Sequence, residues 1–182
     1  MKDLIRSIIK PENGIETAIV NDAAFIEGCS YGKKRYGHPE GQVIYHIQEV
    51  LANIDKYYGD DEDRQDLRLI AIIHDTFKYK VNRKLPKTGE NHHGMIARRF
   101  AQNYINDYGI CKIIEIHDDA YNAWGKGARH GDWYQAERKA NQLIQGLLVE
   151  SRLNLYIKFY RCDNETGDKS QECFEWFNNL IK

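Results

Sequence analysis

The sequence lacks the features that mark several large classes of protein. Its 182 residues contain only three prolines and four cysteines, and no Cys-x-x-Cys spacing occurs. An even number of cysteines permits disulfides, but scattered cysteines in a chain of this length favour free cytosolic thiols. No segment approaches 18 continuous apolar residues, and the N-terminus has no signal-peptide core. We therefore expect a cytoplasmic protein that does not bind a membrane.

A large net charge is also missing. The 26 Lys and Arg residues nearly balance the 27 Asp and Glu residues, which gives a formal net charge of −1. Without a global basic field the chain gives no strong nucleic-acid signal, although the cluster Lys33-Lys34-Arg35 could still meet a phosphate group. The length fits one domain over residues 1–182 with a buried core, and it leaves open whether the protein forms an oligomer.

The pattern of apolar residues is helical. They recur mostly at spacings of three and four, and no convincing period-two strand is found. We therefore expect an all-α, single-domain helical bundle. The expected helices cover about 2–9, 14–29, 40–58, 62–79, 91–107, 110–122, 132–162 and 168–181, with ends good to about 2–4 residues.

The strongest chemical signal is the pair His74-Asp75, which closes the apolar stretch 67–73. An imidazole beside a carboxylate is costly to bury unless something binds both groups. A divalent metal does so, because it accepts nitrogen and carboxylate oxygen together. Other candidates fall on the apolar faces or at the ends of their own helical segments, and any one of them alone would more often be an ordinary core or surface group. Together they predict a shared metal site; they are His46, His93, His117 and Asp163.

Two of these assignments have competitors. His92 competes with His93, and we favour His93 because it is in phase with Ile96 and Ala97. Asp132 competes with Asp163 for the last carboxylate. Asp132 lies in the segment 131–134, whose pattern is typical of a helix N-cap, a structural role that aspartate fills well.

The order of these residues resembles the H…HD…D signature of the HD superfamily of metal-dependent phosphohydrolases. The match consists of His46, then His74-Asp75, then Asp163, and it spans roughly residues 30–165. His93 and His117 stand in the positions of the extra histidines that two-metal members carry. The segment 73–78 looks like the HD-x-G-K version of the motif, except that Phe77 replaces the glycine, so the local backbone there is expected to differ.

The resemblance implies an HD-type fold and hydrolysis of a phosphomonoester or phosphodiester, with a nucleotide or similar small molecule as substrate. Ligands without cysteine suit two divalent ions chosen from Fe, Mn, Ni, Co, Zn or Mg, and a bound ion activates water. Asp75 is placed to bridge two ions, Lys78 to neutralise a phosphate oxygen, and Asp118 or Asp119 to act as a general base. The residues expected to contact substrate are Arg35, Lys78 and Tyr121.

Two other functions are compatible with the same residues. Some two-iron members of the superfamily are oxygenases that use O₂ on the same fold. A regulatory module could also hold metal and nucleotide without turnover, but such modules usually lack at least one ligand, and here the ligand set is full.

Overall fold

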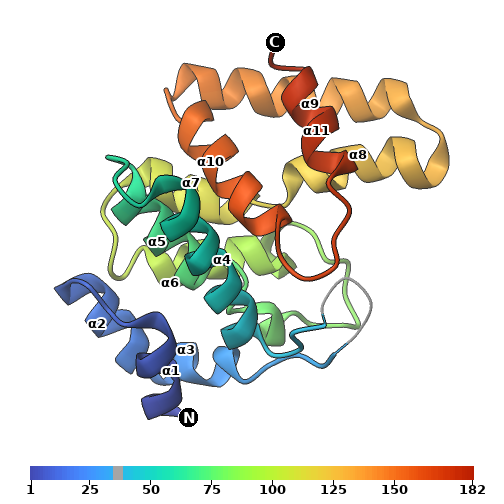
Figure 1. Cartoon of the computed structure of the whole chain (residues 1–182). Helices are drawn as coiled ribbons and strands as arrows, with labels where there is room; N and C mark the ends of the chain where they lie inside the picture. Colours follow the sequence, from blue (N-terminus) through green and yellow to red (C-terminus); the bar gives the residue numbers. More distant parts are fainter. Residues whose placement is uncertain (35–38) are drawn as a thin grey trace.

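The computed structural model describes residues 1–34 and 39–182, and within these ranges it contains helices and no strand (Figure 1). The all-α expectation is therefore confirmed. The helices are α1 (Lys2–Ile9), α2 (Gly14–Asn21), α3 (Ala23–Cys29), α4 (Val43–Tyr58), α5 (Arg64–Ile73), η1 (Lys78–Lys80), η2 (Gly89–Asn91), α6 (His93–Ala101), α7 (Tyr108–Ile116), α8 (Asp119–His130), α9 (Trp133–Val149), α10 (Leu153–Asn164) and α11 (Glu172–Asn179).

Helix α5 lies at the centre of the molecule. Every residue from 67 to 73 is buried, so this helix has no solvent face in its second half. It contacts α4, α7 and α10, and α6 in turn packs on α7. A helix that is apolar almost all round must be covered on all sides, which explains why α4, α7 and α10 all pack against it. The pair α8–α9 and helix α11 lie on one side of this core, and α1–α3 lie on the opposite side (Figure 1).

A buried ion pair ties the N-terminal helices to α5. Arg68 is 3% exposed, and Glu16 of α2 is fully buried. The guanidinium donates from Nε to Glu16 Oε1 and from an Nη atom to Glu16 Oε2, both at 2.9 Å, and to the carbonyl oxygen of Ile9 at 3.1 Å. The bidentate geometry and the backbone contact together satisfy the one charged side chain in the buried stretch of α5.

Three of the expected helices are each divided in two. Asp22 interrupts 14–29, because its carboxylate accepts hydrogen bonds from the N–H groups of Ala24 and Phe25 and starts a new helix there. Ser151, with φ of 54°, interrupts 132–162. Residues 117–118 interrupt 110–122, and α5 ends at Ile73 instead of continuing to 79. The last two breaks both place a histidine just after a helix end.

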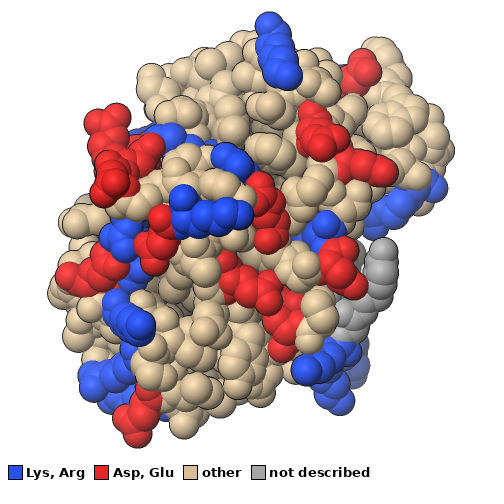
Figure 2. All heavy atoms as spheres, in the orientation of Figure 1, with Lys and Arg blue, Asp and Glu red and all other residues tan. Residues whose placement is uncertain are grey.

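The remaining general expectations concern cysteines, charge and membranes. All four cysteines are buried and free. On the face shown in Figure 2, acidic and basic side chains are intermixed. In the part of the chain that is described, no helix is long and apolar enough to cross a membrane.

Candidate metal centre

All six side chains that the sequence singled out as metal ligands meet in one place. They come from five segments that are far apart in the sequence, and one of these segments supplies two of them. The ligand candidates are His46 in α4, His74 and Asp75 directly after α5, His93 at the start of α6, His117 directly after α7 and Asp163 near the end of α10.

Four of them form a first group of converging ligand atoms. His46 Nε2 lies 3.2 Å from His74 Nε2 and 3.0 Å from Asp163 Oδ1. Asp75 Oδ2 lies 3.6 Å from His46 Nε2 and 3.7 Å from His74 Nε2. Two imidazole nitrogens and two carboxylate oxygens at this spacing match the ligand set that a divalent first-row ion accepts.

The other oxygen of Asp75 belongs to a second group. Asp75 Oδ1 lies 3.3 Å from His117 Nε2 and 3.4 Å from His93 Nε2, and the two ring nitrogens are 3.2 Å apart. Asp75 is 5% exposed and its Oδ1 has no hydrogen bond of acceptable geometry among the described residues. One buried carboxylate therefore presents one oxygen to each group, which is the arrangement of a ligand that bridges two ions.

Backbone contacts fix which nitrogen of two rings is available for a metal. His74 Nδ1 is 2.9 Å from the carbonyl oxygen of Ala71, and His117 Nδ1 is 2.8 Å from that of Ile114. A carbonyl oxygen only accepts, so Nδ1 donates in both rings, and in a neutral ring Nε2 then carries a lone pair. These lone pairs face other nitrogens and carboxylate oxygens. Acceptors that converge in a buried space require a cation, and the residues present therefore fit a metal.

The same contacts explain why the helices end where they do. Both histidines lie three residues after the carbonyl to which they donate, at the C-terminal turn where helical carbonyl groups lose their usual partners. The imidazole of His74 satisfies one such carbonyl at the end of α5, and that of His117 does so at the end of α7. A single side chain thus caps the helix and presents Nε2 to the centre.

Glu40 supports the other imidazole ring of the first group, that of His46, and sequence reasoning did not single it out for this role. Its Oε1 lies 3.7 Å from Nδ1 of His46, and the side chains are 4% and 3% exposed. A carboxylate behind a ligating imidazole favours the tautomer that leaves Nε2 free and orients the ring. Glu40 is only six residues from His46, but nothing in the pattern of apolar residues reveals this contact.

The pKa values of the centre reflect a competition between burial and the charges that its side chains carry. Burial lowers the pKa of His74 to about 3, although Asp75 opposes the shift. Burial also opposes protonation of His117, yet Asp75 and the other nearby carboxylates outweigh it and raise its pKa to about 9. Burial alone would raise the pKa of Asp75, but the Lys78 ammonium and the imidazoles hold it well below its usual range. The carboxylates stay ionised and attract positive charge into the site.

The two competing assignments occupy different places. His93 lies in the second group, whereas His92 caps α6 by accepting a hydrogen bond from Gly94 N at 3.3 Å. Nε2 of His92 lies 3.5 Å from Asp118 Oδ2, so His92, His93 and Asp118 form a third set of closely spaced ligand atoms beside the second group. Asp132 caps α9 by accepting from Gln135 N at 3.0 Å, as its pattern predicted.

A cavity of about 590 Å³ opens onto the centre. Its lining includes the expected residues Lys78, Asp118 and Tyr121. The Lys78 ammonium donates to Asp75 Oδ2, and Tyr121 is 43% exposed and lies 5.9 Å from the ring of Trp124. Sequence reasoning missed several residues of this lining, since only the folded chain brings them together; they include Trp124, Tyr160, Asn164, Lys169 and Cys173.

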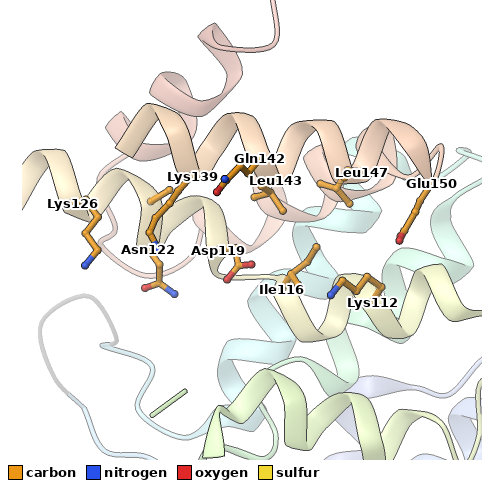
Figure 3. Close-up of a pocket in the computed structure, with 12 residues that line it drawn as sticks. Lys112, Ile116, Asp119, Asn122, Lys126, Lys139, Gln142, Leu143, Leu147 and Glu150 are labelled. Atoms are coloured by element: carbon orange, nitrogen blue, oxygen red, sulfur yellow. The ribbon is translucent and has the colours of Figure 1, made fainter. Parts of the chain in front are cut away.

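The described lining of this cavity does not include Asp119. Arg35 lies outside the described residues. Asp119 lines a separate hollow of about 400 Å³ between α7, α8 and α9, together with Lys126 and Lys139 (Figure 3). None of the six candidate ligands lines that hollow. Of the two adjacent aspartates, Asp118 is therefore the one that faces the metal centre.

Phe77, which replaces the motif's glycine, adopts an ordinary backbone conformation. Its φ is −100° and its ψ is 14°, a region open to residues with a side chain. The ring is buried and packs on Phe100 with centroids 4.5 Å apart. The substitution therefore adds a core contact under the His74-Asp75 turn, and the turn does not need glycine in this protein.

Comparison with known proteins gives one result. A family model described as HD domain matches residues 43–150, more than half of the chain. The match covers the segment from α4 to the end of α9 and includes His46, the His74-Asp75 pair, His93 and His117, while Asp163 and all of α10 and α11 lie beyond it. No curated protein and no solved structure matches the chain.

Proposed function

The chain belongs to the HD-domain family, and on that premise we propose that it is a metal-dependent phosphohydrolase. The substrate would be a phosphomonoester or phosphodiester of a nucleotide or a related small molecule. The observation that carries the proposal is the position of Asp75, whose two oxygens face two separate pairs of imidazole nitrogens at 3.3–3.7 Å. This arrangement supports two divalent ions, one held by His46, His74, Asp75 and Asp163, the other by Asp75, His93 and His117.

The ligand set narrows the chemistry of the ions. Imidazole and carboxylate without thiolate suit Fe, Mn, Co, Ni, Zn or Mg. Ions of this kind, when bound, lower the pKa of coordinated water toward about 7 and polarise a phosphoryl oxygen. The protein supplies a buried, preorganised set of donors, so binding requires little rearrangement.

The residues around the ions have roles of their own. Lys78 reaches the cavity from one side, where its ammonium can neutralise a phosphoryl oxygen during in-line attack. Asp118 lines the same cavity and is placed to accept a proton as general base. Tyr121, with Trp124 one turn further along α8, offers aromatic surface on which a nucleobase can stack. Arg35 is retained as a phosphate contact on sequence grounds alone.

A screen of phosphorylated metabolites tests the proposal. The protein is loaded separately with Mn²⁺, Fe²⁺, Co²⁺ or Ni²⁺ and assayed for phosphate release without O₂. Release that disappears in His74→Ala, together with its metal, is the expected result. Consumption of O₂ without phosphate release would identify a di-iron oxygenase instead, and nucleotide binding without turnover would identify a regulatory module.

A further inference from the structure

Tyr160 carries a buried hydroxyl group that makes no hydrogen bond of acceptable geometry with the described residues, although the Cys173 sulfur lies beside it. The residue is 2% exposed and lines the cavity at the metal centre. Its Oη has no hydrogen-bond partner among residues 1–34 and 39–182. The ring is held by T-shaped contacts with Phe174 at 5.6 Å and Phe177 at 5.8 Å, so the hydroxyl keeps one position. A buried polar group without a partner is unusual enough to need an explanation.

The polar groups beside Tyr160 are already committed to each other. The Cys173 thiol donates to Asn164 Oδ1 at 2.9 Å, and Asn164 Nδ2 donates to Gln171 Oε1 at 2.8 Å. The sulfur that remains next to Tyr160 is a weak acceptor. Burial raises the pKa of the Tyr160 phenol above its ordinary value, so the group keeps its proton and offers a hydrogen to whatever enters the cavity.

Tyr156, one turn earlier on the same helix, is different. It is also fully buried, but its hydroxyl accepts from Ala120 N at 3.2 Å and lies 3.3 Å from the carbonyl oxygen of His117, to which it can donate. Both tyrosines share α10 and a similar aromatic environment. Only the one that lines the cavity lacks a partner, which points to a ligand and not to a general property of this helix.

The residues that line the cavity near Tyr160 favour one kind of ligand. Tyr160 and Cys173 come from α10 and α11, which lie outside the residues that the HD-domain model matches. The cavity wall around Tyr160 is aromatic, and Asp163, Asp168 and Lys169 line the cavity with it. The Lys169 ammonium is already paired with Asp163 Oδ1 at 3.1 Å, so the net charge of the three is negative. A second anionic group would be repelled there, whereas an uncharged acceptor would not.

We propose that the Tyr160 hydroxyl donates a hydrogen bond to an uncharged oxygen or nitrogen on the alcohol portion of the substrate, in a subsite separate from the one that holds the phosphoryl group. The inference rests on the proposed function, because it divides the same cavity between the two halves of a phosphate ester. Lys78 and the ions bind the phosphoryl half, and Tyr160 with Trp124 binds the other half and contributes to specificity.

Binding of the two halves, measured separately by calorimetry, tests the subsite without any turnover. The probes are the four ribonucleosides, which carry uncharged acceptors, and inorganic phosphate, with Mn²⁺-loaded wild-type protein and Tyr160→Phe. The dissociation constant of the best nucleoside should rise about tenfold in the variant, the loss of one hydrogen bond to an acceptor then left unpaired. The dissociation constant of phosphate should change less than about twofold. The ratio of the two dissociation constants should therefore differ between the variant and the wild type.

Stability supplies the matched control. Tyr160→Phe should not lower Tm, since it removes a hydroxyl without a partner, whereas Tyr156→Phe should lower it by leaving the Ala120 N–H and a carbonyl unpaired. Unchanged nucleoside affinity in Tyr160→Phe, an equal loss for phosphate, or a wild-type protein that binds no nucleoside would each overturn the subsite. Nucleoside binding through Tyr160 in a protein that hydrolyses no ester would refute the hydrolase and leave the subsite standing.

Discussion

Asp163 and Asp132 are the same type of residue, but their surroundings give them different roles. Asp163 Oδ1 is 3.0 Å from His46 Nε2, and Lys169 holds the same oxygen at 3.1 Å. Asp132 accepts a hydrogen bond from Gln135 N at the start of α9. The first contact is that of a ligand and the second that of a helix cap.

Replacing the two aspartates should therefore have different effects on metal content and stability. Asp163→Ala should lose metal, because it removes the only carboxylate besides Asp75 from the first group of described ligand atoms. Asp132→Ala should keep its metal and lose about 1 kcal/mol of unfolding free energy, as expected for a lost N-cap. Elemental analysis and urea denaturation of both variants check this, and metal loss from Asp132→Ala alone would reverse the assignment.

Substitutions of Lys78 test whether its charge has a catalytic or a structural role. Its side chain is 29% exposed, and its ammonium pairs with Asp75 at the edge of the cavity. Lys78→Met keeps the apolar body, so Tm and metal content should change little, while kcat should fall on the order of 10²-fold. Lys78→Arg should not fully restore kcat, because a planar guanidinium cannot occupy the position of an ammonium. Steady-state kinetics measure kcat in both variants. A wild-type kcat in Lys78→Met would show that Lys78 is a solvated residue at a helix end without a catalytic role.

The residue types and their order reveal the six candidate ligands, since histidine and aspartate on apolar faces stand out. They do not reveal Glu40, Tyr160 or Lys169. A glutamate or lysine near a helix end and a tyrosine on an apolar face have common structural roles. Their contacts with the centre follow from how α4, α10 and α11 pack, and single-sequence patterns carry no such distances.

Helices α6 and α7 position the second group by an unusually close approach. A Cβ atom added to Gly94 would overlap the carbonyl oxygen of Glu115 in α7. Gly94 directly follows His93, and the short contact between backbones is what brings His93 Nε2 to 3.2 Å from His117 Nε2.

Gly94→Ala should therefore push α6 away from α7. We expect a loss of about 1–3 kcal/mol of unfolding free energy from the overpacked contact, and weaker binding of the second ion. Gly146→Ala in α9, where an added Cβ meets nothing within 4 Å, should instead gain about 0.5–1 kcal/mol. Urea denaturation and metal titration compare the two; equal ion affinity and stability in Gly94→Ala and wild type would contradict this role of the glycine.

The positions of most helices follow from the three- and four-residue spacing, but the breaks within 110–122 and 132–162 do not. Ile113, Ile114, His117 and Tyr121 keep the helical phase across the end of α7, so the pattern continues where the helix stops. The interruption comes from His117, whose ring bonds a carbonyl of the last turn. At the other break the chain turns at Ser151, which has a positive φ. A glycine at this position would have predicted the turn from sequence, but a serine does not.

For the molecule as a whole, the Glu16–Arg68 pair is a buried polar link between the N-terminal helices and the core. Glu16→Gln removes the buried carboxylate that pairs bidentately with Arg68 and leaves the guanidinium only the carboxylate of the partly exposed Glu12, whose Oε1 lies at 3.2 Å. We expect a loss on the order of 3 kcal/mol of unfolding free energy. Asp55→Asn is the matched control, because Asp55 pairs with Arg64 but is 55% exposed. It should cost less than about 1 kcal/mol. Equal shifts of the urea midpoint in the two variants would show that the buried pair contributes no more to stability than the exposed one.

The metal centre links segments that are spread over most of the chain. Its candidate ligands run from residue 46 to residue 163 and belong to α4, α6 and α10 or to the turns that follow α5 and α7. An ion that binds only the folded arrangement stabilises all these segments together by mass action. Metal binding at these buried carboxylates should therefore raise global stability.

The central claim is that Asp75 bridges two ions, and anomalous X-ray diffraction from crystals of Mn²⁺-loaded protein tests it most directly. The account predicts two anomalous peaks, one beside His46, His74 and Asp163, the other beside His93 and His117, with the Asp75 carboxylate between them. A single peak at full occupancy with His93 and His117 turned away, or no peak at this centre, would contradict it.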